Sequence, residues 1–140
     1  MAGFYSKGLS VALEAATGVT AAPTGTLKGA FMATTYTQDQ ETDQFWSDVS
    51  ANIAAGTTVR TLAGTTITVD TANDRVEINF DDPSETPVTA VTDQFLIYMD
   101  TGVDATSPLI VNGALAATLS PVGGTLTLTV NAEGLAAVNY

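Results

Sequence analysis

Alternating hydrophobic and polar residues in the middle of the chain predict two paired β-strands. The first run is Thr65–Asp70 and the second is Arg75–Asp81, and each places every second residue on an apolar face. Residues 70–74 carry turn chemistry, so the two runs are expected to form a half-buried antiparallel hairpin. The residues expected to point inward are Ile67, Val69, Val76, Ile78 and Phe80.

Further short strands are expected on both sides of this hairpin. Leu27–Ala33 alternates in a similar way, whereas Phe95–Met99 is apolar on both faces, which predicts a central strand covered from two sides. Leu109–Val111 and Leu115–Leu119 are predicted as two strands joined at Asn112-Gly113, because this dipeptide favours a tight type I′ turn.

Loops and one short helix are expected to separate the strands. Tyr36–Gln44 is polar and acidic, and two prolines bar Asp82–Pro87 from a central ladder, so both are predicted as loops. Phe45–Ala51 has apolar residues at helical spacing and predicts a short helix. Apolar alternation resumes at Leu126, and Glu133–Tyr140 is expected to be an edge strand. About eight short strands at this spacing are typical of a sandwich, a jelly roll or a barrel.

Residues 1–26 differ from the rest of the chain. Four glycines and Pro23 interrupt them, so we expect an irregular N-terminal arm followed by one β-domain over residues 27–140. Such an arm is either a frayed terminus or a segment that becomes ordered on a neighbouring chain. No stretch approaches the roughly 18 unbroken apolar residues of a membrane span, and no continuous apolar region marks a signal peptide.

Composition narrows the chemistry that the chain can perform. None of the 140 residues is cysteine or histidine, which excludes thiol nucleophiles, Cys-based metal sites and a histidine general base. The formal net charge of −11 would repel a phosphate backbone, so nucleic-acid binding is not expected. The 24 threonines and 21 alanines give much neutral surface, which a partner can cover at a low desolvation cost.

Two groups of acidic residues are the candidate sites for a cation. Asp39, Glu41 and Asp43 would project the same way if their segment were extended, and their oxygens would suit calcium or magnesium. The second group is Asp81, Asp82 and Glu85. For both groups, a solvated acidic loop is the favoured interpretation. Paired carboxylates could also serve glycoside hydrolysis, but 15 acidic residues allow too many pairs to assign one.

Aromatic and basic residues leave further alternatives open. Trp46 is either a core residue or a ligand platform, Tyr98 is expected in the core, and Tyr36 and Tyr140 could be surface anchors, because Tyr is enriched at interfaces. The basic residues do not cluster in sequence and are expected to be solvated cations. They are Lys7, Lys28, Arg60 and Arg75.

Several short motifs occur in the same order as in one group of viral proteins. They are Leu27-Lys28-Gly29-Ala30, Tyr36-Thr37-Gln38-Asp39, Phe45-Trp46-Ser47-Asp48-Val49 with Asn52, Tyr98-Met99-Asp100-Thr101-Gly102, Ser107-Pro108-Leu109-Ile110 and Gly134-Leu135. Over residues 27–140 the chain resembles the capsid decoration, or cement, proteins of tailed bacteriophages, most closely those of podovirus-like phages that infect Bordetella. Many relatives have lysine where this chain has Met99.

The resemblance implies an all-β, single-domain antiparallel β-sandwich of jelly-roll type. It implies a homodimer on the capsid exterior of the virion that bridges major capsid protein subunits and stabilises the expanded shell, after synthesis in the host cytoplasm. We expect no catalytic residue, no metal ligand, no cofactor and no membrane or nucleic-acid partner, and therefore no enzyme. The alternative is a receptor- or carbohydrate-binding β-sandwich module of a phage tail or adhesin, with its ligand near Trp46.

Overall fold

The computed structural model describes residues 3–5, 25–70, 75–129 and 136–139. Within these ranges the chain is mainly antiparallel β-structure with one short α-helix, α2, which spans Trp46–Val49. The strands are β1 (Gly3–Phe4), β2 (Thr26–Ala33), β3 (Arg60–Thr61), β4 (Thr66–Asp70), β5 (Arg75–Asn79), β6 (Ser84–Val88), β7 (Thr92–Asp100), β8 (Leu109–Leu119), β9 (Gly124–Thr127) and β10 (Ala136–Asn139). Two 3-10 turns span Ser50–Asn52 and Asp104–Thr106.

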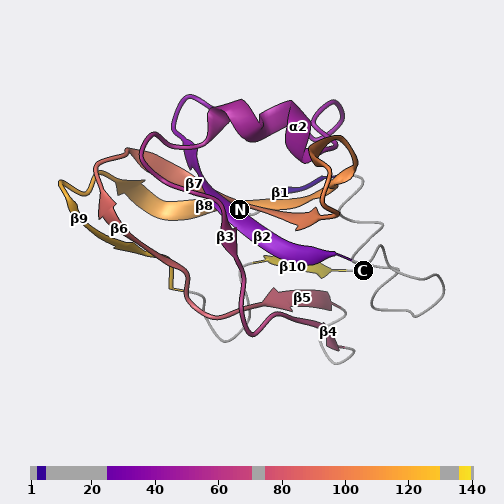
Figure 1. The fold of residues 1–140 in the computed structure, drawn as a ribbon. Helices are drawn as coiled ribbons and strands as arrows, with labels where there is room; N and C mark the ends of the chain where they lie inside the picture. The colour runs from indigo at the N-terminus through magenta and orange to yellow at the C-terminus, as the bar shows by residue number, and fades with distance from the viewer. Residues whose placement is uncertain (1–2, 6–24, 71–74, 130–135, 140) are drawn as a thin grey trace.

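The strands form one large sheet and two small ones. The large sheet has the order β1-β8-β7-β2-β3, the second has the order β10-β5-β4, and β6 pairs with β9. Figure 1 shows α2 over one face of the large sheet and the two small sheets on its other side. The expected antiparallel all-β class and the short helix within Phe45–Ala51 are therefore confirmed. None of the described helices is long and apolar enough to cross a membrane.

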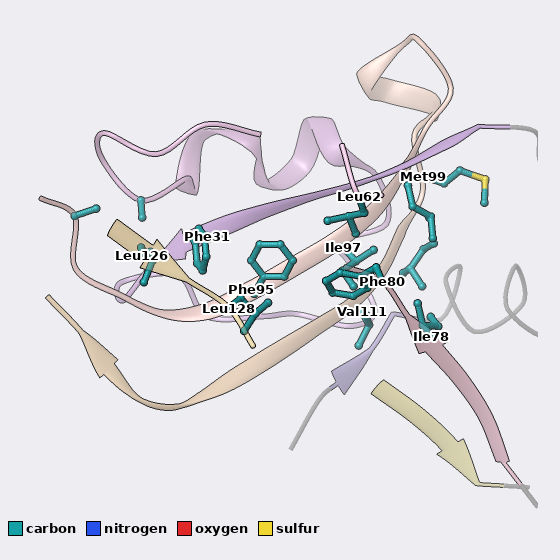
Figure 2. Packing of buried hydrophobic residues seen from close by; sticks show 14 of the residues in the cluster. Phe31, Leu62, Ile78, Phe80, Phe95, Ile97, Met99, Val111, Leu126 and Leu128 are labelled. Carbon is teal, nitrogen blue, oxygen red and sulfur yellow. The ribbon is translucent and has the colours of Figure 1, made fainter. Parts of the chain in front are cut away.

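Strand β7 is central, as its apolar residues predict. It lies between β2 and β8, and its side chains point alternately into two separate hydrophobic clusters. Phe95, Ile97 and Met99 face the small sheets, where Figure 2 shows them with Phe80 and Leu126. The alternate residues Leu96 and Tyr98 face the opposite side, where they pack with α2; we call this side the helix layer. Because both faces are covered, the stretch Phe95–Met99 of this strand presents no side chain for a partner to bind.

The core on the helix side is built around two stacked aromatic rings. The Trp46 ring from α2 lies 4.2 Å from the Tyr98 ring of β7, and the two planes differ by only 6°. The helix begins at Trp46 because the Asp48 carboxylate accepts the Phe45 backbone N–H at 2.9 Å and the Gln44 N–H at 3.0 Å. These two bonds satisfy donors that a helix start leaves free.

The predicted hairpin is present as β4 and β5. Asp70 pairs with Arg75 and Ile67 pairs with Ile78, which is the register that the alternating pattern requires. Ile78 and Phe80 are buried, while the turn itself, residues 71–74, lies outside the described residues. The tail also forms an edge strand as predicted, because β10 pairs with β5 along its length.

The predicted turn at Asn112-Gly113 is wrong. Both residues lie inside β8, which runs unbroken for 11 residues from Leu109 to Leu119. Gly113 does not have a positive φ, which a type I′ turn would need, and it pairs with Phe95 of β7. The long ladder with β7 overrides the local turn preference of the dipeptide, because it satisfies the backbone of both residues.

The predicted loop over Asp82–Pro87 is also wrong in part. Ser84–Val88 forms β6, which pairs with β9 through Ser84, Glu85 and Val88. The register is interrupted between Glu85 and Val88, so Pro87, which has no N–H, sits where the ladder is irregular. The prolines keep this strand out of the large sheet, as expected, but a two-stranded sheet tolerates them.

The expected N-terminal arm, residues 1–26, falls mostly outside the described residues. Its residues Gly3 and Phe4 form β1 at the edge of the large sheet, where they pair with Asn112 and Val111. Tyr5 follows with its side chain fully buried, and its N–H donates to the Ile110 carbonyl at 3.1 Å. The start of this segment therefore packs as part of the domain.

Candidate functional site

The first acidic group does not gather its carboxylates at one point. Asp39 Oδ1 accepts the N–H groups of Glu41 at 3.0 Å and Thr42 at 3.1 Å, so the segment forms a turn and is not extended. Asp43 Oδ2 accepts the Tyr36 hydroxyl at 2.9 Å and the Asp39 N–H at 3.2 Å. Hydrogen bonds from Thr42 and then Glu41 hold the pKa of Asp39 below its usual value. These carboxylates stabilise their own loop, which contradicts the extended arrangement.

The second acidic group is divided between the core and the surface. Asp81 and Asp82 are exposed, whereas Glu85 is buried and 5% exposed. Glu85 accepts the Thr58 N–H at 2.9 Å, the Thr58 hydroxyl at 2.7 Å and the Arg60 Nε–H at 3.0 Å. Across the described ranges, no three acidic, cysteine or histidine side chains are placed to hold a metal ion together.

Two of the four basic residues form ion pairs, contrary to the expectation of solvated cations. Arg60 pairs with Glu85, and Lys28 of β2 pairs with Asp100 at the end of β7. The hydrogen bond from Lys28 and then that from the Gly102 N–H hold the pKa of Asp100 below its usual value. Lys7 lies outside the described residues.

The aromatic candidates are core residues. Trp46 is 4% exposed and stacked on Tyr98, so it offers no platform to a ligand. Tyr36 is also buried, and its proposed role as a surface anchor is wrong. The Tyr36 hydroxyl lies 2.7 Å from the hydroxyl of Tyr5 and donates to Asp43. Burial, followed by the hydrogen bond to Asp43, raises the pKa of Tyr36. Tyr140 lies outside the described residues.

A polar pocket lies beside the start of β7 and the second half of β8. Its volume is about 440 Å³. It is lined by Gln38, Asp93, Gln94, Asn112, Ala114, Leu115, Ala117 and Thr118. Two oxygen atoms of these residues, Asp93 Oδ1 and Asn112 Oδ1, are buried and have no hydrogen-bond partner among the described residues. Such atoms are rare in folded proteins and point to a bound water, ion or ligand.

A chain of hydrogen bonds fixes the orientation of the Asn112 amide. Gln94 Nε2 donates to the backbone carbonyl of Tyr36 at 2.9 Å, so its oxygen must face Asn112. That oxygen accepts Asn112 Nδ2 at 2.6 Å, which leaves Asn112 Oδ1 as the free acceptor. These residues could not be identified from the sequence, because Asn112 carries a turn signal and Asp93 and Gln94 belong to no recognisable motif.

The β8 side of this pocket belongs to a long uncharged run of the chain. No residue from Ala105 to Ala132 is charged, and the described part of this run includes β8, a turn and β9. In the second half of β8 and the following turn, the exposed residues are Ala114, Ala116, Ala117, Thr118, Ser120, Val122 and Gly123. Val122 is 95% exposed. We call this surface the neutral strip. Its long uncharged run is a signal that sequence inspection alone could have found.

The backbone edge of the neutral strip is open on one side within the described residues. Strand β1 pairs only with Val111 and Asn112 of β8, while β7 pairs along the opposite edge as far as Ala114 and again at Leu119, with a register shift between these two positions. An unpaired strand edge can accept hydrogen bonds from another chain.

Compared with known proteins, the chain matches no family model, no curated protein and no solved structure.

Proposed function

We propose that this chain is a structural virion protein that binds the outer surface of an icosahedral phage capsid. There it clamps neighbouring major capsid protein subunits and stabilises the expanded shell. The observation that carries the proposal is the neutral strip, an uncharged and exposed surface on a chain whose net charge is −11. The ordered motifs that resemble capsid decoration proteins supply the class of partner.

The neutral strip suits adhesion because its burial requires no charge to leave water. Burying an isolated charge is costly, whereas methyl groups gain roughly 25 cal/mol for each Å² removed from water. Ala116, Ala117 and Val122 provide such groups without long side chains that would lose conformational freedom on binding. The acidic residues elsewhere keep free copies apart and soluble before they bind.

The proposed mechanism is thermodynamic. A protein that binds only the expanded shell stabilises that form by mass action. A homodimer that engages two subunits gains effective concentration, so that modest contacts at each site add to tight binding. The jelly-roll arrangement of the sandwich, the homodimer, the position on the capsid exterior and the lack of enzymatic activity all belong to this proposal.

The burial of Trp46 favours this role over a receptor- or carbohydrate-binding module. Sugar sites commonly present exposed aromatic rings, and Trp46 was the residue expected to supply one. Its side chain is covered by Tyr98 and is 4% exposed. Among the described side chains, the remaining phenylalanines and tyrosines are also buried or half-buried.

Co-sedimentation with shells tests the proposal. Purified protein is mixed with expanded shells assembled from the major capsid protein of the same phage, and the shells are then heated with and without it. We expect the protein to pellet with the shells and to raise their disruption temperature. Ala116→Glu places a charge on the neutral strip and should abolish both effects. Ala63→Glu, at an exposed position between β3 and β4, is the matched control and should change neither.

Two experimental outcomes would contradict the proposal. Shells that melt at the same temperature with and without bound protein contradict the clamp. Equal binding by the Ala116→Glu and Ala63→Glu proteins would show that the neutral strip is not the contact surface. Both substitutions lie at exposed sites, where changes usually alter stability by less than about 0.5 kcal/mol, so folding does not confound the comparison.

A further inference from the structure

We propose that the polar pocket beside the neutral strip binds the cationic end of a lysine or arginine side chain. The inference rests on the proposed function for the identity of the partner, which is a capsid subunit. The pocket is lined in part by Asp93 and Asn112, and each of these residues holds a buried side-chain oxygen without a hydrogen-bond partner among the described residues. It adds one specific polar contact to an otherwise uncharged interface.

The pocket needs a ligand that brings hydrogen-bond donors. A buried acceptor without a donor is unfavourable, and here two residues that line one pocket each hold such an oxygen. Asn112 is 5% exposed, and it cannot turn its amide nitrogen toward the pocket without losing the 2.6 Å bond to Gln94. Gln94 is held in turn by its bond to the Tyr36 carbonyl. The acceptor at Asn112 is therefore built into the fold.

The charge and shape of the pocket favour a single positive charge on an aliphatic stem. Asp93 is its one acidic lining residue, which matches one ammonium or guanidinium group. The apolar part of the lining comes from Ala114, Leu115 and Ala117. They can pack against the methylene groups of a lysine or arginine, which prefer apolar contacts.

A divalent cation fits the same lining less well. Calcium is held by six to eight oxygen ligands, usually with several carboxylates among them, and strong sites depend on that charge. One carboxylate and a few amide oxygens supply too little negative charge for such a site. An anionic ligand is excluded by the same oxygens, because both free atoms are acceptors and one belongs to a carboxylate.

Nuclear magnetic resonance titration of the full chain tests the pocket without any capsid. The probes are n-butylammonium and n-butylguanidinium, which mimic the ends of lysine and arginine, with uncharged butyramide and calcium chloride as comparisons at equal ionic strength. We expect saturable shifts of the backbone amides of Asp93, Gln94 and Asn112 with one or both alkyl cations. Linear shifts that butyramide reproduces, or saturation by calcium alone, would overturn the inference.

Three variants locate the binding. Asp93→Asn removes the charge at constant shape and should weaken the alkyl cation at least tenfold. Asp104→Asn removes one exposed carboxylate away from the pocket and should leave the affinity unchanged. Ala117→Met fills the pocket from an exposed position and should also abolish binding, even if Asp93→Asn disturbs the fold. Undiminished binding by the Asp93→Asn and Ala117→Met proteins contradicts the site.

The two proposals fail in different ways. If the alkyl cations bind the pocket but the protein does not pellet with shells, the pocket stands and the capsid partner is wrong. If the protein pellets with shells and Asp93→Asn binds them as tightly as the unaltered chain, the capsid role stands and the pocket is not part of its interface. A tenfold loss of shell binding by Asp93→Asn alone, with Asp104→Asn unchanged, supports both.

Discussion

The buried hydroxyls of Tyr5 and Tyr36 allow a prediction in which the same substitution lowers the stability of the unaltered chain but raises the stability of a variant. Tyr36 must donate to Asp43, because a carboxylate can only accept. A hydroxyl has one proton, so Tyr36 accepts the hydrogen bond from Tyr5 at 2.7 Å, and Tyr5 is the donor. The order of donation is therefore Tyr5 to Tyr36 to Asp43.

Removing the middle hydroxyl should cost more stability than removing the first. Tyr36→Phe leaves the Tyr5 hydroxyl without an acceptor, and Tyr5 is fully buried, which predicts a loss of about 1–3 kcal/mol. Tyr5→Phe removes a donor but leaves the bond from Tyr36 to Asp43 intact, so we expect a loss of about 0.5–1.5 kcal/mol. In the Tyr36→Phe background, Tyr5→Phe removes the orphaned group and should restore part of the lost stability.

Urea unfolding of the four proteins, followed by the fluorescence of Trp46, measures this double-mutant cycle. The unaltered chain and the three variants are compared at pH 7, where both hydroxyls are protonated. The donation from Tyr5 to Tyr36 is refuted if Tyr5→Phe destabilises the Tyr36→Phe protein as much as it destabilises the unaltered chain. A larger loss for Tyr5→Phe than for Tyr36→Phe would reverse the assigned donor order.

Three further predictions address other buried groups. Burial, and then nearby carboxylates, raise the pKa of Tyr98 to about 12. Because the Tyr98 hydroxyl loses its proton at a lower pH in the unfolded chain than in the folded one, the stabilisation that Tyr98 contributes is complete below pH 10. About 2–3 kcal/mol of it is lost as the pH rises to about 12. Urea unfolding at alkaline pH measures this loss, and an unfolding midpoint that does not change with pH contradicts it. Trp46→Ala should cost about 3–5 kcal/mol by circular dichroism, whereas a surface platform would cost little. Glu85→Gln weakens the charge-assisted bond from Arg60 and should cost about 1–3 kcal/mol, while exposed Glu41→Gln should change stability by less than about 0.5 kcal/mol; equal losses count against the buried network.

The covered central sheet limits where this protein can act. One face of β7 packs on the helix layer and the other on the small sheets, so partners can reach only edges, turns and outer layers. The second half of β8 is the place where an uncharged surface, an edge open within the described residues and a polar pocket coincide. This coincidence is why both proposals concern the same part of the molecule.

Some of the candidate site could be predicted from the sequence and some could not. The absence of histidine and cysteine is a property of composition and needs no structure. Asp39, Glu41 and Asp43 would gather only in an extended segment, and three hydrogen bonds from neighbouring backbone N–H groups instead curl the segment into a turn. The pocket was invisible, because it depends on Asn112 meeting Gln94 from a strand 18 residues away.

Local periodicity was enough to determine the elements whose residues all favour one structure. The β4–β5 hairpin, strand β7 and helix α2 were predicted correctly, since burial on one face or on two faces leaves a period in the sequence. Only the tertiary structure decided that Asn112-Gly113 continues a strand and that Ser84–Val88 forms one. In both places the pairing partner comes from a distant part of the chain, and the hydrogen bonds it provides outweigh the preference of a dipeptide or a proline for a turn.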